Sequence, residues 1–132
     1  MIYLGEIMTT IHESGENYLE TILELEIEKK PIRSAEIAKR LNVSRPSVNK
    51  AINILREAGM VEQERYGTIA LTDDGRKRAS KVKSRHELLF DFLANVLDID
   101  KDTATNDACR IEHIVSEQTI DSLTSFIKSY KK

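Results

Sequence analysis

The sequence has few of the features that mark secreted or membrane proteins. Its 132 residues include one cysteine, Cys109, which cannot form a disulfide within the chain and fits a reducing compartment. No run approaches the roughly 20 consecutive apolar residues that a membrane-spanning helix needs. The mildly apolar start, residues 1–7, has no basic residue before it and is too short for a secretory signal. We therefore expect a cytoplasmic protein that does not contact a membrane.

Motifs that would indicate an enzyme are also missing. The sequence contains no HExxH motif, no nucleophile elbow and no phosphate-binding loop. It has no internal repeats or low-complexity stretches, and its 40% hydrophobic and 32% charged residues are typical of a folded globular chain. We expect one compact domain or two small ones, with no enzymatic activity and no small-molecule substrate.

The net charge of −2 is an average over strongly segregated blocks. Residues 1–28 contain seven acids and no lysine or arginine, whereas residues 29–50 contain seven bases and one acid. Residues 76–85 add six bases without an acid, and residues 86–121 then contain nine acids and two bases. Such segregation indicates one surface for phosphates and another for cations, although solvated faces with no partner are the simpler alternative.

Two short helices joined by a sharp turn are predicted within and just after the first basic block. A first helix is expected over residues 16–30, where leucine and isoleucine recur at helical spacing. Ser34 can cap a helix that runs through Leu41, and Ser44 can cap a second helix that ends at Gly59. The apolar residues of the two helices are spaced one turn apart, with a small residue where the helices would cross, which is typical of a helix–turn–helix.

A hairpin and a helical second half complete the predicted fold. Residues 60–64 and 68–72 are β-like runs separated by three residues, so they predict a hairpin, or wing, directly after the second short helix. A long helix is expected to begin at residue 72 and to continue to about residue 97. Asp100 and Ser116 are suited to begin the last two helices.

The second short helix has the side chains of an element that reads DNA. Arginine, asparagine and serine near a helix N-terminus can form hydrogen bonds with base edges in the major groove. Side chains at the tip of the wing could reach a phosphate or the minor groove. The alternative is a winged helix that contacts protein instead. The candidate residues for binding double-stranded DNA are Arg45, Pro46, Ser47, Asn49, Lys50, Arg65 and Tyr66.

Three potential metal ligands are spaced to share one face of a helix. Cys109, Glu112 and His113 stand at positions i, i+3 and i+4. Thiolate, carboxylate and imidazole all bind transition-metal ions, so one helix could supply three ligands. The alternative is structural, because a single cysteine is more often a small buried hydrophobic residue and a Glu–His pair is commonly solvated.

The first predicted helix and His86 strengthen the metal hypothesis. Asn17, Glu20 and Glu24 lie on one face of that helix, and the two glutamates are like charges one turn apart. Such a pair disfavours the helix unless a cation lies nearby. His86 begins the apolar part of the long helix and is a further candidate ligand. The coincidence of these residues with Cys109 and its neighbours favours a metal site.

An apolar excess follows the second basic block. Eight of the ten residues from 88 to 97 are apolar, so this part of the long helix needs partners on nearly every side. In so small a chain the extra face is most simply buried against a second copy, with burial inside one chain as the alternative. The predicted dimer-interface residues are Leu88, Leu89, Phe92, Leu93 and Val96.

Taken together, these pieces resemble the diphtheria-toxin-repressor and manganese-transport-regulator family of metal-dependent transcriptional repressors. The resemblance spans residues 16–123 and is carried by the helix–turn–helix, by Glu16-Asn17-Tyr18-Leu19-Glu20, by Arg85-His86-Glu87-Leu88-Leu89 and by Cys109-Arg110-Ile111-Glu112-His113. It implies the short, two-domain form of the family, which is mainly α with a small β-hairpin wing. A winged helix–turn–helix DNA-binding domain is expected over residues 1–78. A helical dimerisation and metal-binding domain is expected over residues 79–132.

The resemblance also implies a ligand set. Asn17 stands where the manganese branch has Asp and the iron branch has Met, whereas Cys109 agrees with the iron branch and replaces a Glu of the manganese branch. Phe90 and Thr105 stand where the iron branch has the ligands of its ancillary site, so that site is not expected in its iron-type form. The implied ligands are Cys109, Glu112 and His113 of the primary-site segment, Glu20 and His86 of the manganese branch, and Asn17.

The resulting hypothesis is a homodimeric, metal-dependent repressor of metal-ion homeostasis that binds a palindromic operator. Fe²⁺ or Mn²⁺ would activate it, and Zn²⁺, Co²⁺ or Ni²⁺ could replace them in vitro. The metal would join the first helix to the segment from Cys109 to His113 and so favour the arrangement that binds DNA. The alternative function is a winged-helix regulator that senses redox state or an organic ligand.

Overall fold

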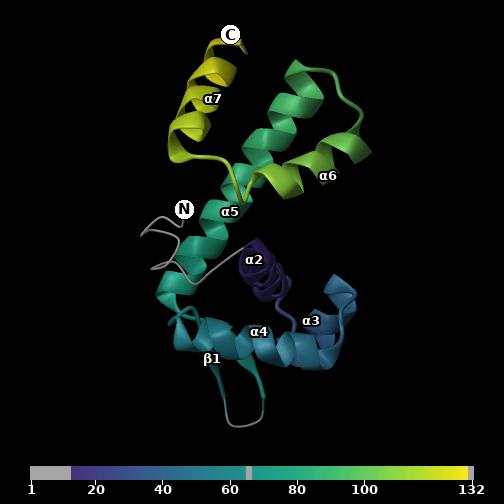
Figure 1. Cartoon of the computed structure of the whole chain (residues 1–132), viewed down its shortest axis with the longest axis vertical. Helices are drawn as coiled ribbons and strands as arrows, with labels where there is room; N and C mark the ends of the chain where they lie inside the picture. Colours follow the sequence, from purple (N-terminus) through teal and green to yellow (C-terminus); the bar gives the residue numbers. More distant parts are fainter. Residues whose placement is uncertain (1–12, 65–66, 131–132) are drawn as a thin grey trace, which may run out of the picture. The chain divides into compact units, whose positions relative to one another are not determined.

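The structure is a computed structural model that describes residues 13–64 and 67–130. It is mainly helical with one small antiparallel sheet, which confirms the predicted fold class. The chain divides into two compact units between Ser80 and Lys81, within helix α5 (Asp73–Asp91). Figure 1 shows the elements in chain order.

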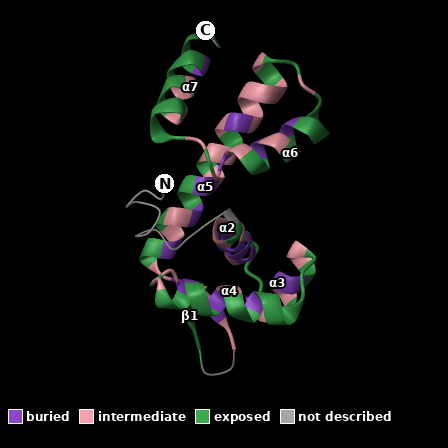
Figure 2. Cartoon of the chain, viewed as in Figure 1, coloured by how far each residue is buried: buried purple, intermediate pink, exposed green. Residues whose placement is uncertain are grey.

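Helix α2 (Glu13–Ile27) is central to the core of the first unit. Leu19, Ile22 and Leu25 are fully buried at spacings of three residues, and Figure 2 shows buried positions along this helix. Helix α2 begins and ends three residues before the predicted range of residues 16–30. Helices α3 (Ser34–Leu41) and α4 (Arg45–Glu57), the hairpin and the first half of α5 add further buried residues to this core, among them Ile37, Val48, Ile52, Leu55, Val61, Ile69, Leu71 and Ala79.

Helices α3 (Ser34–Leu41) and α4 (Arg45–Glu57) form the helix–turn–helix. Ser34 is the first residue of α3 and not its cap, so that prediction is wrong. Arg33 occupies the N-cap position without a side-chain bond. The Ser34 hydroxyl instead donates to Oδ1 of Asn49 on α4, at 3.0 Å, and so links the two helices.

The turn into α4 and the start of that helix agree with the prediction. Asn42 adopts the left-handed conformation with φ of 56°, which asparagine tolerates better than most residues. The Ser44 side chain accepts a hydrogen bond from the Ser47 backbone N–H and so caps α4. Pro46 lies in the first turn, where its missing N–H removes no helical bond. Gly59, with φ of 78°, follows the end of the helix.

The predicted wing is a two-stranded hairpin. Strand β1 (Val61–Gln63) pairs antiparallel with β2 (Ile69–Leu71), and Val61 lies opposite Leu71. Three side chains of the hairpin, those of Val61, Ile69 and Leu71, are buried in the core of the first unit. The hairpin is therefore anchored at its base.

Thr72 and Gly75 fix the start of α5 against the hairpin. The Thr72 hydroxyl accepts a hydrogen bond from the Gly75 backbone N–H at 3.0 Å and donates to the carbonyl oxygen of Gly59 at 2.6 Å. The predicted start of the long helix is thus confirmed. A side chain at Gly75 would collide with the carbonyl oxygen of Met60, so this position requires glycine because of close packing.

The second unit contains the rest of α5 and three further elements. The predicted long helix changes at its end into a π-helical turn, η1 (Phe92–Val96). Helix α6 (Lys101–Ile111) begins after Asp100, whose carboxylate accepts from the Thr103 N–H, and this confirms the predicted cap. Helix α7 (Glu117–Tyr130) follows, with Ser116 as its cap, as predicted. Both α6 and α7 pack against η1.

The predicted dimer-interface residues are partly used inside the second unit. Leu89 is only 3% exposed, so it belongs to the core of its own unit and offers little surface to a partner. The side chains of Leu88, Phe92, Leu93 and Val96 are half-buried. Within residues 13–64 and 67–130, no helix has both the length and the apolar character needed to cross a membrane.

Candidate functional site

Helix α4 presents the predicted DNA-contacting residues to solvent. Val48, Ile52 and Leu55 are buried on one side of the helix, and the polar residues project from the other side. The exposed candidates are Arg45, Pro46, Ser47, Asn49 and Lys50. The two candidates at the tip of the wing, Arg65 and Tyr66, lie outside the described residues. The helix–turn–helix therefore exposes a polar face that begins at the N-terminus of α4.

The acidic and basic blocks pair with each other within the first unit. Glu16 meets Arg78 at 2.7 Å, and Glu26 accepts two hydrogen bonds from Arg76, at 2.8 and 3.0 Å. Arg76 lowers the pKa of Glu26, chiefly through these hydrogen bonds. These arginines are therefore not simply free for phosphate, as the charge pattern suggested.

A third arginine corrects one argument for the metal site. Arg40 Nη1 lies 3.8 Å from the carboxylate of Glu24 and donates to Glu28 at 2.7 Å. Hydrogen bonds from Arg40 and then Lys30 lower the pKa of Glu28 to about 2. The like charges of Glu20 and Glu24 therefore do not indicate a bound metal ion, because Arg40 on α3 places a positive charge beside Glu24.

The three predicted ligands near residue 110 do not all lie on a helix. Helix α6 ends at Ile111, and Glu112 occupies its C-cap position in right-handed helical conformation. Cys109 and Glu112 therefore keep the spacing of a helical turn, whereas His113 follows in a non-helical turn. The prediction of one helical face holds for the first two residues but not for His113.

His86 completes a cluster with Cys109 and Glu112. One ligand atom from each of these three residues lies within 4.8 Å of the other two. His86 Nδ1 is 3.2 Å from Glu112 Oε2 and 3.7 Å from Cys109 Sγ. His113 approaches the other carboxylate oxygen, with Nε2 3.4 Å from Oε1. Glu112 therefore lies between two imidazoles, beside a thiol.

The surroundings of Glu112 fit a divalent transition-metal ion. Its side chain is 0% exposed, and within the described part of the chain neither oxygen has a hydrogen-bond partner, although the His86 and His113 nitrogens lie 3.2 and 3.4 Å away. A buried carboxylate without such partners is costly. Ligand atoms about 2.0–2.3 Å from a tetrahedral ion lie about 3–4 Å from one another, and His86 Nδ1 lies at such distances from Glu112 Oε2 and Cys109 Sγ. Thiol, imidazole and carboxylate are suitable donors for such an ion.

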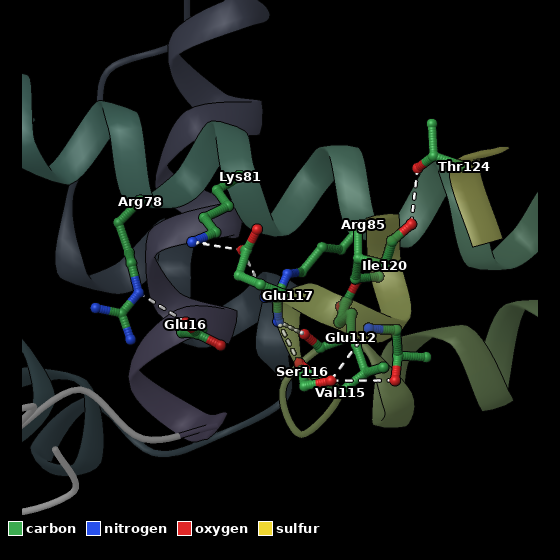
Figure 3. A network of polar contacts seen from close by, with 11 residues as sticks. Glu16, Arg78, Lys81, Arg85, Glu112, Val115, Ser116, Glu117, Ile120 and Thr124 are labelled. Atoms are coloured by element: carbon green, nitrogen blue, oxygen red, sulfur yellow. Dashed lines mark hydrogen bonds and ion pairs between the residues drawn. The ribbon is translucent and has the colours of Figure 1, made fainter. Parts of the chain in front are cut away.

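Arg85 contacts the turn that contains Glu112, and it was not predicted as a site residue from the sequence. Its Nη1 donates to the carbonyl oxygens of Glu112, at 3.2 Å, and Val115, at 2.9 Å, while Nη2 donates to Glu117 at 2.9 Å (Figure 3). The charge pattern placed Arg85 in a basic block suited to phosphate. Arg85 also begins the segment Arg85-His86-Glu87-Leu88-Leu89, which carries the family resemblance, and this was the signal of a different role.

The remaining candidate ligands lie in the first unit. Asn17 and Glu20 are both on α2, and both are half-buried. Both side chains make polar interactions within the structure. Their roles as metal ligands stay predictions.

Comparisons with known proteins cover both halves of the chain. Residues 10–69 match the N-terminal DNA-binding domain of iron-dependent repressors, and residues 72–132 match their metal-binding and dimerisation domain. An uncharacterised HTH-type transcriptional regulator of Methanocaldococcus jannaschii is 34% identical over 120 residues, which cover 90% of this chain and 96% of that protein. The transcriptional regulator MntR of Salmonella typhimurium is 33% identical over 115 residues, which cover 87% of this chain and 73% of that protein.

A solved structure shows the same arrangement of elements. The manganese regulator SloR is similar with a TM-score of 0.79 and 29% sequence identity, over 91% of this chain and 55% of the SloR chain. This chain therefore spans about half the length of SloR. The resemblance predicted from the sequence is confirmed: the chain belongs to the family of iron-dependent repressors, which are DNA-binding transcriptional regulators and not enzymes.

Proposed function

We propose that this chain is a homodimeric repressor whose affinity for a palindromic operator depends on a divalent metal ion. The observation that supports this most strongly is Glu112, whose carboxylate is buried beside His86, Cys109 and His113 without a hydrogen-bond partner in the described residues. When bound, the ion supplies the positive charge that this carboxylate requires. The regulated genes would serve metal-ion homeostasis.

The donor set favours Fe²⁺ or Mn²⁺ as the activating ion. The Cys109 thiol together with imidazole suits Fe²⁺, and the carboxylate of Glu112 also suits Mn²⁺. The same donors accept Zn²⁺, Co²⁺ and Ni²⁺ in vitro. Asn17 and Glu20 are retained as further candidate ligands on the strength of the family resemblance.

The exposed face of α4 would provide operator recognition. Arg45 stands at the first position of that helix, where a side chain can reach a guanine edge in the major groove. If Arg45 contacts a base, Arg45→Ala should weaken operator binding by about 1–3 kcal/mol and leave binding to random DNA little changed. Equal weakening on operator and random duplexes would show that Arg45 contacts phosphate alone.

An apolar surface on the second unit would provide the dimer contact. Phe92 and Phe126 meet edge to face with ring centroids 6.2 Å apart, and Phe126 stacks on Tyr130 at 5.9 Å. Phe126 and Tyr130 are 50% and 57% exposed. Because the matched family domain is a dimerisation domain, we propose a second copy as the partner of these rings, together with Leu88, Leu93 and Val96.

The function is tested by measuring whether DNA affinity depends on metal. A duplex selected from a random-sequence library by the protein with Mn²⁺ serves as the operator, and fluorescence anisotropy gives Kd with Mn²⁺ or with chelator. We expect the wild type to bind the operator tightly with Mn²⁺ and weakly with chelator. Glu112→Ala with His113→Ala should bind weakly in both conditions and remain dimeric by sedimentation.

A control variant and a contradicting outcome complete this test. Asn106→Ala, at an exposed position on α6, should bind DNA as the wild type does. If wild type and the double variant both bind DNA equally well with Mn²⁺ and with chelator, the chain is not a metal switch.

A further inference from the structure

Arg85 holds the segment that joins α6 to α7. Its Nη1 donates to the carbonyl oxygens of Glu112 and Val115, and its Nη2 donates to the carboxylate of Glu117 at the start of α7. Lys81, one helical turn earlier on α5, contacts the same Glu117 carboxylate at 2.7 Å (Figure 3). The two carbonyls lie in the connection between the helices, where the helical ladder provides no partner. The guanidinium takes the place of that ladder.

Arg85 and its neighbour His86 approach Glu112 at two separate points. Arg85 contacts the main-chain oxygen of Glu112 at 3.2 Å, and His86 Nδ1 lies 3.2 Å from the side-chain oxygen Oε2. Consecutive residues on a helix point about 100° apart, so the two side chains approach Glu112 from different directions. The main-chain contact restrains the backbone of Glu112, from which the carboxylate beside His86 extends.

We propose that Arg85 is a positioning residue of the metal site, which binds no ion itself but holds the main chain of residues 112–115. The proposal rests on the metal binding proposed above. A planar guanidinium donates in fixed directions to two carbonyls and one carboxylate at once, whereas the three donors of a lysine ammonium rotate about one compact charge and hold no such fixed arrangement. Residues that orient metal ligands typically change metal affinity by about 10–100-fold when replaced.

Three substitutions separate positioning from charge and from general stability. Arg85→Lys keeps the positive charge but loses the planar guanidinium and its fixed N–H donors. It also removes the buried Nε, which has no hydrogen-bond partner in the described residues, and this limits the loss of stability. Arg85→Gln removes the charge as well. Glu117→Gln is the matched control, because it weakens the ion pairs of Lys81 and Arg85 but leaves both carbonyl contacts in place.

The measurement is an anaerobic titration with Co²⁺, whose ligand-field bands report coordination geometry and whose titration curve gives affinity. Urea unfolding of each metal-free variant reports stability separately. We expect Arg85→Lys and Arg85→Gln to weaken Co²⁺ binding by about 10-fold or more and to change the band shape. Glu117→Gln should bind within about twofold of wild type, since the held carbonyls are unaffected.

The sign of the Arg85→Gln effect is decisive. Removal of a positive charge near a cation site strengthens binding if charge alone matters, whereas the positioning role predicts weaker binding. Wild-type affinity and spectrum in Arg85→Lys would overturn the proposal, as would tighter binding in Arg85→Gln. A wild-type protein that fails to bind Co²⁺ would overturn the proposed function as well.

If neither Arg85 variant folds, hydrogen exchange of the wild-type protein provides the test. The amides of residues 114 and 115 donate to the carbonyl of Ile111, and a held segment should protect them from exchange. Exchange of these amides at the rate of an open chain would overturn the role of Arg85.

Discussion

Replacement of Glu112 by glutamine is expected to stabilise the metal-free protein and to remove its stabilisation by metal. The buried carboxylate has lost its hydration, and within the described residues its oxygens gain no hydrogen bond in return. The nearby imidazoles of His86 and His113 offset part of that cost. Glutamine keeps the shape and stays polar but removes the charge, and an unpaired charge costs more to bury than an unpaired amide, so we expect a gain of about 1–3 kcal/mol.

The assay is thermal unfolding with chelator and with Mn²⁺. For a chain of this length about 1 kcal/mol corresponds to roughly 4 °C in Tm, so metal-free Glu112→Gln should melt about 4–12 °C above wild type. Free Mn²⁺ at about 100 times Kd should stabilise the wild type by about 2.7 kcal/mol, or roughly 10 °C, and should not stabilise the variant. Glu117→Gln, at an exposed acid, should show no gain in metal-free Tm. A Glu112→Gln protein that melts below wild type in chelator would refute this account, because Glu112 would then be a structural partner of the histidines.

Three further predictions concern the first unit. The pKa of Glu28 is held at about 2, chiefly by Arg40, so the stability from this pair is complete above about pH 4.5 and is lost as pH falls towards 2; acid titration of Glu28→Gln should show a flatter loss of stability. Ile52→Ala should cost about 2–5 kcal/mol in urea unfolding because the side chain is 1% exposed, whereas Ile54→Ala on the same helix, at 44% exposed, should cost well under half as much. Gly75→Ala should lower Tm clearly, since the new methyl group meets a carbonyl oxygen of the hairpin, and an unchanged Tm would show that α5 shifts without cost.

Features set by neighbouring residues were predictable from the sequence. The caps at Ser44, Asp100 and Ser116 form as expected, because each needs only an acceptor side chain placed before a helix. The hairpin between α4 and α5 follows from two short β-like runs separated by three residues. Ser34 shows the limit of this approach, because its hydroxyl does not cap a helix but donates a hydrogen bond to Asn49, which is 15 residues away.

Pairings across the chain were not predictable from local pattern. The charge blocks indicated separate surfaces for phosphate and cations, but Glu26 meets Arg76, 50 residues away, and Glu16 meets Arg78. Segregated charges along a sequence can thus be complementary faces of one fold. Arg85, counted among the bases for phosphate, faces carbonyl oxygens instead.

The cluster around Glu112 was found in two ways. Spacing alone related Cys109 to Glu112 along one turn of helix. His86 is 23 residues from Cys109, so no helical spacing relates the two; its place at the start of the apolar part of the long helix made it a candidate, and the family resemblance added it to the ligand set. Helix α6 ends at Ile111, which moves His113 off the helix, and Arg85 contacts the turn that follows.

Anomalous diffraction from crystals grown with Mn²⁺ tests the metal site most directly. We expect an anomalous peak within bonding distance, about 2.0–2.4 Å, of ligand atoms from His86, Cys109 and Glu112. A second crystal grown with anaerobic Fe²⁺ should show a peak at the same place. Well-ordered side chains of these three residues with no ion among them, at saturating metal, would contradict the account.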